Sequence, residues 1–314
     1  MPRWTDKLQS DLRLLRKKLI DLFNMFYYIM HKLLGKQLMH NKLKKPKTGR
    51  GSLEMRLLAY VQMRKLEVVR TGDISAALKI TPKQERELLS RLNRSGMIVW
   101  LKRGAYLVPP RIPAGGQLAV SENYILSMLM KELKGKYQVS GPNAFNFYGF
   151  DNQVPNRVYV YNNRIYGEKN IGGFDFVFIK TSDDRIGSAS ESQTPTGEKI
   201  CMVTKARALL DAVYDWSRYD TIPRAYRWIL MSIENSPEFR KEFIKVALKF
   251  GNKGTIRRIG YLLAEAGVPG STLKSFQEKA GSIKSLIKLN PKGSAKGPVN
   301  KEWGLIINGA IVTD

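Results

Sequence analysis

The alternation of hydrophobic and polar positions is clearest between Ile80 and Pro110, where its period changes once. In the first half, three leucines recur at helical spacing, so that one stripe of a helix is buried; they are Leu88, Leu89 and Leu92. Thr81 suits an N-cap, and Gln84 follows three residues later, as a capping box requires. Gly96 is typical of a helix end, because glycine takes the left-handed conformation easily. The pattern therefore predicts a helix between Thr81 and Gly96.

Behind this helix the hydrophobic period falls to two, which is typical of short β-strands. Residues 97–101 and 105–108 alternate in this way, with Gly104 in the turn between them. Two basic residues, Lys102 and Arg103, stand beside that glycine at the tip of the predicted hairpin. A basic helix followed by a basic hairpin is typical of the winged helix-turn-helix, whose helix enters the major groove of DNA and whose wing touches the backbone.

Two helical segments precede this unit. Residues 52–69 carry apolar side chains on one side, and residues 74–78 predict a short second helix. With the hairpin they complete a winged helix-turn-helix DNA-binding domain, which we place at residues 52–112. The segment Arg111–Gln117, RIPAGGQ, is rich in proline and glycine and marks the end of this domain.

Residues 1–51 are a separate N-terminal extension. Its apolar positions between residues 8 and 33 alternate at spacings of four and three residues, which is typical of a heptad-repeat helix in a coiled coil. Residues 42–51, KLKKPKTGRG, follow as a basic linker without large apolar residues after its second position. The extension thus joins a long apolar stripe to the DNA-binding domain.

Three interpretations of the heptad helix stay open. We prefer a homodimer through residues 8–33, because two DNA half-sites multiply affinity. The helix can instead pack onto the rest of its own chain, or lie on a membrane surface. Asp21, Asn24 and His31 interrupt the apolar run, so we expect no membrane span.

Residues 113–314 form the predicted C-terminal domain, in which β-strands precede helices. Four runs rich in β-branched and aromatic residues predict strands, at residues 137–140, 157–161, 174–179 and 199–203. Five helices are predicted at residues 204–216, 222–233, 237–250, 255–266 and 271–280. A polar connection occupies Thr181–Gly197, and the apolar run Trp303–Ile311 suits a last strand. The predicted fold class is α+β: the winged helix-turn-helix, then a mixed α/β and finally helical domain, preceded by the heptad helix.

The charge indicates the kind of partner. The 314 residues include 53 Lys and Arg against 27 Asp and Glu, a net charge of +26. Such an excess costs self-repulsion and is typical of proteins that bind a polyanion, nucleic acid before an anionic membrane. The alternative is a basic surface that serves solubility only.

The histidine and cysteine content excludes several classes of site. Cys201 is the only cysteine, so the chain has no disulfide framework and no thiolate zinc site. His31 and His40 are the only histidines, and both lie in the N-terminal extension. From residue 51 onward the chain therefore lacks an imidazole for a nucleophile pair or a metal. The N-terminus does not resemble a cleavable signal peptide, so we expect a cytoplasmic protein. Because these cysteine and histidine ligands are missing, we also expect neither a cofactor nor a bound metal.

Several segments, in this order and spacing, are similar to one family. They are LSRLNRSGMIVWLKRGAYLVPP, VSGPNAFNFYGF (139–150), NRVYVY, IGGFDFVFIK (171–180), VTKARALLDAVY (203–214) and TIRRIGYLLAEAG (255–267). Together they resemble AbiEi-type antitoxins of abortive-infection (type IV) toxin–antitoxin systems. The heptad helix is not part of that pattern, and Asn93 and Ser95 stand where more basic residues are expected.

The resemblance implies a cytoplasmic phage-defence protein of two domains. The winged domain would act as a transcriptional repressor on the operator of its own operon. The C-terminal antitoxin domain would oppose a nucleotidyltransferase toxin, AbiEii-like, with direct contact left open. The alternatives are a winged-helix transcriptional regulator without a toxin partner and, from another class, a metal-dependent nuclease.

The predicted DNA contacts lie on the polar side of the helix and on the wing. Arginine can bind guanine and glutamine can bind adenine with two hydrogen bonds, whereas lysine suits phosphate. The set is Lys83, Gln84, Arg86, Ser90, Arg91, Arg94, Lys102 and Arg103. A second basic surface is predicted from Lys241, Lys245 and Lys249 at helical spacing, with Arg257 and Arg258 nearby. For both sets the alternative is an ordinary solvated helix face.

We expect no enzymatic activity. A nuclease of the restriction type needs clustered carboxylates and a lysine around a metal, and Asp175 is the main hint of one. Asp211 is better explained as a helix-face acid that pairs with Arg207 four residues earlier. Cys201 lies between apolar neighbours and is most simply a buried small residue.

If Arg91 reads a base, Arg91→Ala should weaken binding of the chain to its operator by roughly 1–3 kcal/mol. The measurement is a footprinting titration of the DNA upstream of the gene. An unchanged footprint would remove Arg91 from the contact set.

Overall fold

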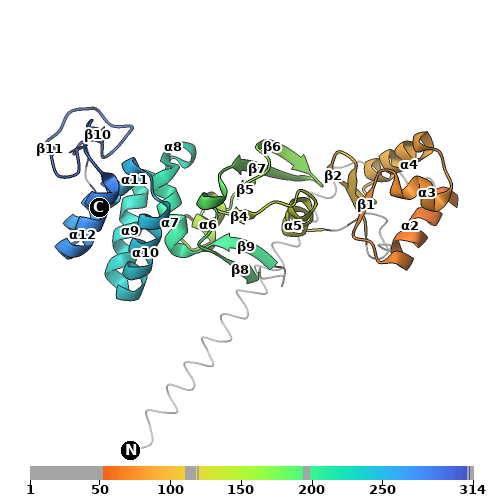
Figure 1. Cartoon of the computed structure of the whole chain (residues 1–314), viewed down its shortest axis with the longest axis horizontal. Helices are drawn as coiled ribbons and strands as arrows, with labels where there is room; N and C mark the ends of the chain where they lie inside the picture. The colour runs from red at the N-terminus through yellow and green to blue at the C-terminus, as the bar shows by residue number, and fades with distance from the viewer. Residues whose placement is uncertain (1–51, 110–117, 119, 194–198, 310, 312–314) are drawn as a thin grey trace, which may run out of the picture. The chain divides into compact units, whose positions relative to one another are not determined.

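A computed structural model describes residues 52–109, 118, 120–193, 199–309 and 311 of the chain. The described residues form a mixed α/β structure with helices α2 to α12 and three β-sheets (Figure 1). Among them, every helix is too short or too polar to cross a membrane. The heptad segment 8–33, the basic linker 42–51 and the joint at 111–117 lie outside the described residues.

The first part contains three helices and a small antiparallel sheet. They are α2 (Ser52–Arg64), β1 (Val68–Arg70), α3 (Asp73–Leu78), α4 (Pro82–Arg94), β2 (Val99–Lys102) and β3 (Ala105–Leu107). The sheet order is β1-β3-β2, and the β2–β3 hairpin turns at Arg103 and Gly104. The predicted first helix was too long: the chain turns at Lys65 (φ 51°), and Val68 then pairs with Leu107 of β3. Two β-branched valines favour the strand over a longer helix.

Helix α4 has the cap that the sequence predicts. The Thr81 hydroxyl accepts a hydrogen bond from the Gln84 backbone N–H (3.2 Å), and the side-chain carbonyl of Gln84 accepts one from the Thr81 backbone N–H (2.9 Å). Leu88, Leu89 and Leu92 face the core of this part of the chain, each at most 2% exposed. The capping box and the leucine stripe together fix where α4 begins and which side it turns outward.

The buried side of α4 also carries a carboxylate. Glu85 is 1% exposed, and it accepts hydrogen bonds from the backbone N–H groups of Gly72 (2.9 Å), Ile74 (3.2 Å) and Ser75 (3.3 Å). These groups belong to the first turn of α3, which has no side-chain cap of its own at Gly72. A negative charge is favourable there, because the helix N-terminus is partially positive and its first N–H groups lack partners. One side chain of α4 therefore caps α3 and holds the two helices in a fixed relation.

The second part is built on a mixed six-stranded sheet. Its elements are α5 (Glu122–Glu132), β4 (Tyr137–Val139), α6 (Pro142–Phe147), β5 (Val158–Asn162), β6 (Gly167–Ile171), β7 (Phe174–Lys180), a short 3-10 helix (Asp183–Arg185), β8 (Ala189–Gln193) and β9 (Lys199–Val203). The strand order is β6-β7-β5-β4-β9-β8. The four predicted strands are confirmed as β4, β5, β7 and β9. The prediction missed both edge strands, and it interpreted β8 as part of a polar connection.

Helices follow the sheet. They are α7 (Lys205–Tyr214), α8 (Trp216–Tyr219), α9 (Arg224–Asn235), α10 (Pro237–Phe250), α11 (Lys253–Glu265) and α12 (Gly270–Ala280), and a small sheet of β10 (Ile287–Lys288), β11 (Val299–Asn300) and β12 (Leu305–Ile306) comes last. The five predicted helices correspond to α7, α9, α10, α11 and α12, and the predicted last strand to β12. Helix α7 contacts α6, α9, α10 and α11, and every residue from Ala206 to Val213 is buried. It is the centre of the helical part.

The interior of α7 contains a charged pair. Arg207 and Asp211 are both 0% exposed, and the Arg207 Nε donates to Asp211 Oδ1 (2.9 Å). The predicted pairing of these two residues is thus confirmed, but in the core rather than on a helix face. The remaining Arg207 donors reach the carbonyls of Gly187 (2.9 Å) and Arg185 (2.8 Å), and Ser140 donates to Asp211 (2.9 Å). Because every group has partners, the pair can stay charged inside.

The β2–β3 hairpin packs on both of its faces. Val108 belongs to the core of the first part, whereas Val99, Leu101 and Leu107 belong to the core around the six-stranded sheet. Helix α5 contacts β2 and β3, and the Arg70 guanidinium forms two hydrogen bonds with the Glu132 carboxylate, at 2.6 and 3.2 Å. The hairpin is therefore held by apolar contacts from both sides.

Replacing Glu85 by glutamine should lower the free energy of unfolding by about 1–3 kcal/mol, because the amide NH2 would face the Gly72 N–H where Oε2 now accepts, and the charge at the N-terminus of α3 would be lost. Chemical denaturation measures the change. Glu87→Gln is the matched control: Glu87 is exposed on the same helix, and its replacement should change stability by less than about 0.5 kcal/mol. Equal effects of the two substitutions would contradict the capping role of Glu85.

Candidate nucleic-acid interface

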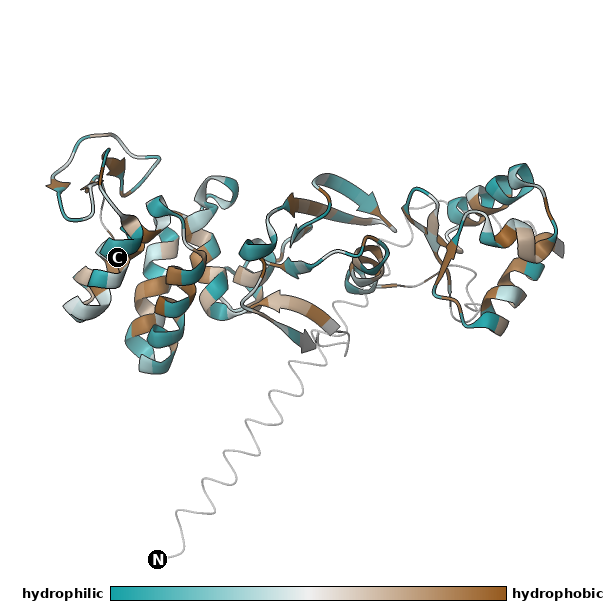
Figure 2. Ribbon diagram, in the orientation of Figure 1, coloured by the Kyte–Doolittle hydropathy of each residue, from teal (hydrophilic) through white to brown (hydrophobic). Residues whose placement is uncertain are grey.

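The predicted DNA contacts on α4 share one exposed side of the helix. The inward leucines turn the opposite side to solvent, and in Figure 2 the side of α4 toward the viewer is largely hydrophilic. All six predicted α4 residues are exposed: Lys83, Gln84, Arg86, Ser90, Arg91 and Arg94. At the tip of the β2–β3 hairpin, Lys102 is half-buried at the end of β2, and Arg103 is exposed in the turn. The structure thus gathers the six helix residues on a single face, with Lys102 and Arg103 at the hairpin tip.

Three members of this set are engaged within the protein: Gln84, Arg91 and Arg94, whose Nε donates to the Ser90 backbone carbonyl (3.4 Å). The Gln84 carbonyl accepts hydrogen bonds from both the N–H (2.9 Å) and the hydroxyl (3.2 Å) of Thr81. Recognition of adenine by two hydrogen bonds needs that carbonyl, so a Gln84 that reads a base must give up the cap. Arg91 pairs with Glu54 (3.2 Å), but its side chain is 49% exposed, and an exposed pair contributes only about 0–1 kcal/mol. Arg91 can therefore exchange Glu54 for a phosphate at little cost.

The face also contains polar groups that the sequence search for cations overlooked. Glu87 is exposed and stands one helical turn from both Lys83 and Arg91. A carboxylate in this position repels phosphates and can accept a hydrogen bond from the cytosine amino group in the major groove. Asn93 accepts a hydrogen bond from the Trp100 backbone N–H (3.0 Å), which ties the end of α4 to β2. The four-residue spacing from Lys83 to Glu87 was the available signal in the sequence.

The second predicted basic surface is smaller than expected. Lys241, Lys245 and Lys249 are exposed along α10, whereas Arg257 and Arg258 are only 7% and 8% exposed. The assignment of these two arginines to a surface was wrong, because α11 is buried along most of its length. An adjacent pair of arginines in a predicted helix does not distinguish a solvated face from guanidinium groups that turn inward.

The two buried arginines bind backbone carbonyl groups of the C-terminal segment. Arg257 donates to Trp303 (2.7 Å), Ser285 (2.8 Å) and Gly304, and Arg258 donates to Lys288 (3.0 Å). Burial is the main cause that lowers the pKa of both guanidinium groups. These contacts make both arginines structural: they fasten the segment after α12 onto α11.

The other candidates for chemistry lie apart from one another. Asp175 is exposed on β7 and accepts a hydrogen bond from Asn170 (2.9 Å). Within the described residues, no three His, Cys, Asp or Glu side chains gather as a metal would require. The half-buried Cys201 thiol donates to the Tyr137 carbonyl (3.3 Å), and burial raises the pKa of the thiol, which disfavours the reactive thiolate.

A buried tyrosine–carboxylate cluster connects the sheet to the end of α7. Tyr161 on β5 donates its hydroxyl hydrogen to Asp215, and its oxygen lies 2.8 Å from the hydroxyl of Tyr219. Burial is the largest cause that raises the pKa of Asp215 and of both tyrosines. At 2% exposure, Tyr161 is a core residue and its ring is closed to a nucleic-acid base.

Comparisons with known proteins leave the family open. No protein-family model matches the chain, and no curated protein matches it. One similar solved structure is the crystal structure of the RV2827C protein from Mycobacterium tuberculosis, which is 15% identical over 82% of this chain and 92% of that chain, with a TM-score of 0.49.

Arg257→Ala should lower the free energy of unfolding by about 2–4 kcal/mol, because it leaves several backbone carbonyls without donors. Lys241→Ala removes the same charge from the exposed face of α10 and should change stability by less than about 0.5 kcal/mol. Thermal or urea denaturation of both variants makes the comparison. A stability change for Arg257→Ala as small as that for Lys241→Ala would contradict the structural role of Arg257 and would support its assignment to the exposed basic surface.

Proposed function

We propose that the chain is a DNA-binding transcriptional repressor that also acts as the antitoxin of a toxin–antitoxin system. In this proposal residues 52–112 form a winged helix-turn-helix that binds the operator of its own operon. Residues 113–314 counter a toxin of the nucleotidyltransferase class. The protein would act in the cytoplasm and without enzymatic activity or a cofactor.

The observation that carries the DNA-binding proposal is the exposed cationic side of α4. Arg86, Arg91 and Arg94 project from a helix whose opposite side is buried to within 2% exposure. Rotation of α4 about its axis is prevented, because its leucines are packed in the core and the Glu85 carboxylate is hydrogen-bonded to the start of α3. A rigid helix with arginines on its free side suits the major groove, where arginine forms two hydrogen bonds with guanine.

The remaining residues divide by chemistry. Lys83 lies in the first turn and suits a phosphate, and Arg94 at the last turn suits a phosphate or a base edge. Ser90, between them in sequence, can donate to either. Lys102 and Arg103 at the hairpin tip would touch the DNA backbone, as wings do. The side chain of Gln84 caps α4 and can contact a base only if it gives up that hydrogen bond.

The antitoxin half of the proposal rests on the family resemblance. Segment 171–180 begins at the last residue of β6 and continues through β7, and segment 203–214 covers α7; both contribute side chains to the core of the C-terminal part. The similar segments therefore favour a common architecture, and the toxin partner follows from the resemblance. A winged-helix regulator without a toxin stays the alternative for the same DNA-binding face.

The DNA-binding proposal predicts different results for two charge-matched double variants. Arg86→Ala with Arg94→Ala should weaken binding to the upstream DNA by roughly 30- to 1000-fold, and it should reduce the slope of log K against log salt by about 2. Lys241→Ala with Lys245→Ala removes the same two charges from α10 and should weaken binding less than about threefold. Fluorescence anisotropy over a salt series provides both quantities. Equal losses for the two variants would contradict binding through α4.

The antitoxin proposal is tested by growth. The full-length chain should restore growth to cells that express the neighbouring nucleotidyltransferase gene. In this proposal the protective activity belongs to residues 113–314. The Arg86→Ala, Arg94→Ala variant, expressed from an independent promoter, should protect as well as the wild type does. Failure of the wild type to protect would leave a regulator without a toxin partner.

A further inference from the structure

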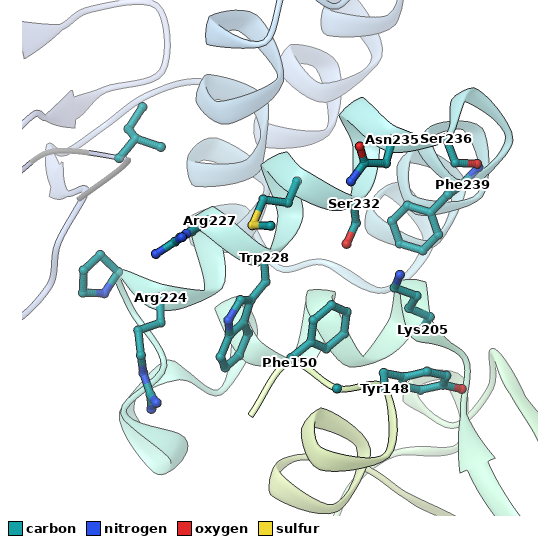
Figure 3. A pocket seen from close by; sticks show the side chains of 14 residues that line it. Tyr148, Phe150, Lys205, Arg224, Arg227, Trp228, Ser232, Asn235, Ser236 and Phe239 are labelled. Atoms are coloured by element: carbon teal, nitrogen blue, oxygen red, sulfur yellow. The ribbon is translucent and has the colours of Figure 1, made fainter. Parts of the chain in front are cut away.

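The C-terminal part contains a cavity of about 700 Å³ beside α9, at the starts of α7 and α10 (Figure 3). Aromatic rings line it, together with three cations, and the hydroxyl of Ser232 points into it. The cations are Lys205, Arg224 and Arg227. None of the lining residues in the described part of the chain carries a carboxylate. Its size is in the range of small-molecule sites.

The aromatic side chains form a continuous row with two of the cations. Trp228 stacks on Phe150, with ring centroids 5.6 Å apart and an interplanar angle of 21°. Arg224 lies over Trp228 at 5.6 Å, and the Lys205 ammonium lies 5.4 Å from the Phe150 ring and 5.3 Å from the Phe239 ring. The arginines and Lys205 therefore stand at opposite ends of this row of rings (Figure 3).

The positive charge at this cavity is poorly compensated. Lys205 is the first residue of α7, and Arg224 is the first residue of α9, so both stand where the partial charge of a helix end is itself positive. Ser236, the N-cap of α10, lines the same cavity. Arg224 pairs with Asp151 (3.3 Å), whereas Lys205 and Arg227 form no ion pair within the described residues. Such an arrangement costs stability, which a bound anion would restore.

We propose that this cavity binds a nucleotide unit, an aromatic base that carries phosphate. The base would stack on Trp228 in place of the exposed Arg224 guanidinium, since every base has a flat face that stacks on aromatic side chains. The phosphate would take the free donors of Arg227 at one end of the row, since guanidinium groups bind phosphate oxygens strongly, and the Lys205 ammonium at the other end would add long-range attraction for the anion. Ser232 and Asn235 supply polar partners for the sugar. The ligand is either a free nucleotide or the terminal nucleotide of an RNA strand.

The proposal is independent of DNA binding and of the toxin. Arg227 and Lys205 lie on α9 and α7, whereas the proposed DNA contacts lie on α4 and the β2–β3 hairpin. Variants of the cavity should therefore keep the affinity of the full-length chain for duplex DNA. Failure of one proposal leaves the other standing.

Isothermal titration calorimetry of the full-length protein at 150 mM salt tests the proposal with four probes. ATP should bind at least tenfold more tightly than tripolyphosphate, which has the charge without the base, and than adenosine, which has the base without the charge. A 5′-phosphorylated tetra-adenylate RNA separates the two sources. Tighter binding of the RNA than of ATP assigns a strand end, and the reverse assigns a free nucleotide.

Two single variants locate the site. Arg227→Ala should weaken ATP binding about tenfold, because it removes a charge-assisted contact, and Lys205→Ala should weaken it about threefold, because it removes a nearby charge only. Lys245→Ala, which removes an exposed charge of α10, should change it less than twofold. All three positions are exposed, so unchanged thermal melting confirms folding.

Three results would overturn the proposal. One is the absence of ATP and RNA binding below about 1 mM. Another is tripolyphosphate binding as tight as that of ATP, which would indicate attraction to the +26 charge alone. The last is an equal loss of affinity in Lys245→Ala.

Discussion

The position of α4 depends on a single buried carboxylate. Glu85 satisfies the first backbone N–H groups of α3 from inside α4, so the two helices share one hydrogen-bond system. Buried backbone N–H groups without acceptors are costly, and α3 has no side-chain cap of its own at Gly72. Any rotation of α4 that moved its leucines would also break these bonds. The arginines of α4 therefore point outward because the leucines and the Glu85 carboxylate on its other side must be buried.

The same principle organises the C-terminal part. The charged pair Arg207 and Asp211 lies at the centre of α7 and binds the segment before β8 through the carbonyls of Arg185 and Gly187. Because α7 is fixed by these contacts, its first residue, Lys205, is held at the cavity between the rings of Phe150 and Phe239. In both parts of the chain, a buried charged group fixes a helix and thereby determines where the exposed cations of that helix point.

Sequence patterns predicted the elements with strong periodicity and strong caps. The capping box at Thr81 and the leucine stripe of α4 depend on neighbours within one helical turn, and both were found. The edge strands β6 and β8 were missed, because an edge strand is polar and gains its stability from pairing with a distant partner. Val68 and Val69 were assigned to a helix, because the strand that they pair with, β3, lies far along the chain.

The predicted site shows the same limit. Exposure of Arg86 and Arg94 follows from the period of α4, so it could be predicted, whereas the burial of Arg257 follows from carbonyl groups of residues 285–304. The row of Arg224, Trp228, Phe150 and Lys205 joins three segments and has no local signature. Charge in a sequence therefore indicates a kind of partner more reliably than it locates a surface.

The central claim is that the outer side of α4 lies against duplex DNA. Photo-crosslinking tests it most directly: benzoylphenylalanine in place of Ser90, at the middle of that side, is irradiated with the DNA upstream of the gene, and Lys245 on α10 is replaced in a parallel protein. The account predicts a covalent adduct at position 90, competed by unlabelled upstream DNA, and none at position 245. Adducts at position 245 alone, or equal adducts at both positions, would contradict it.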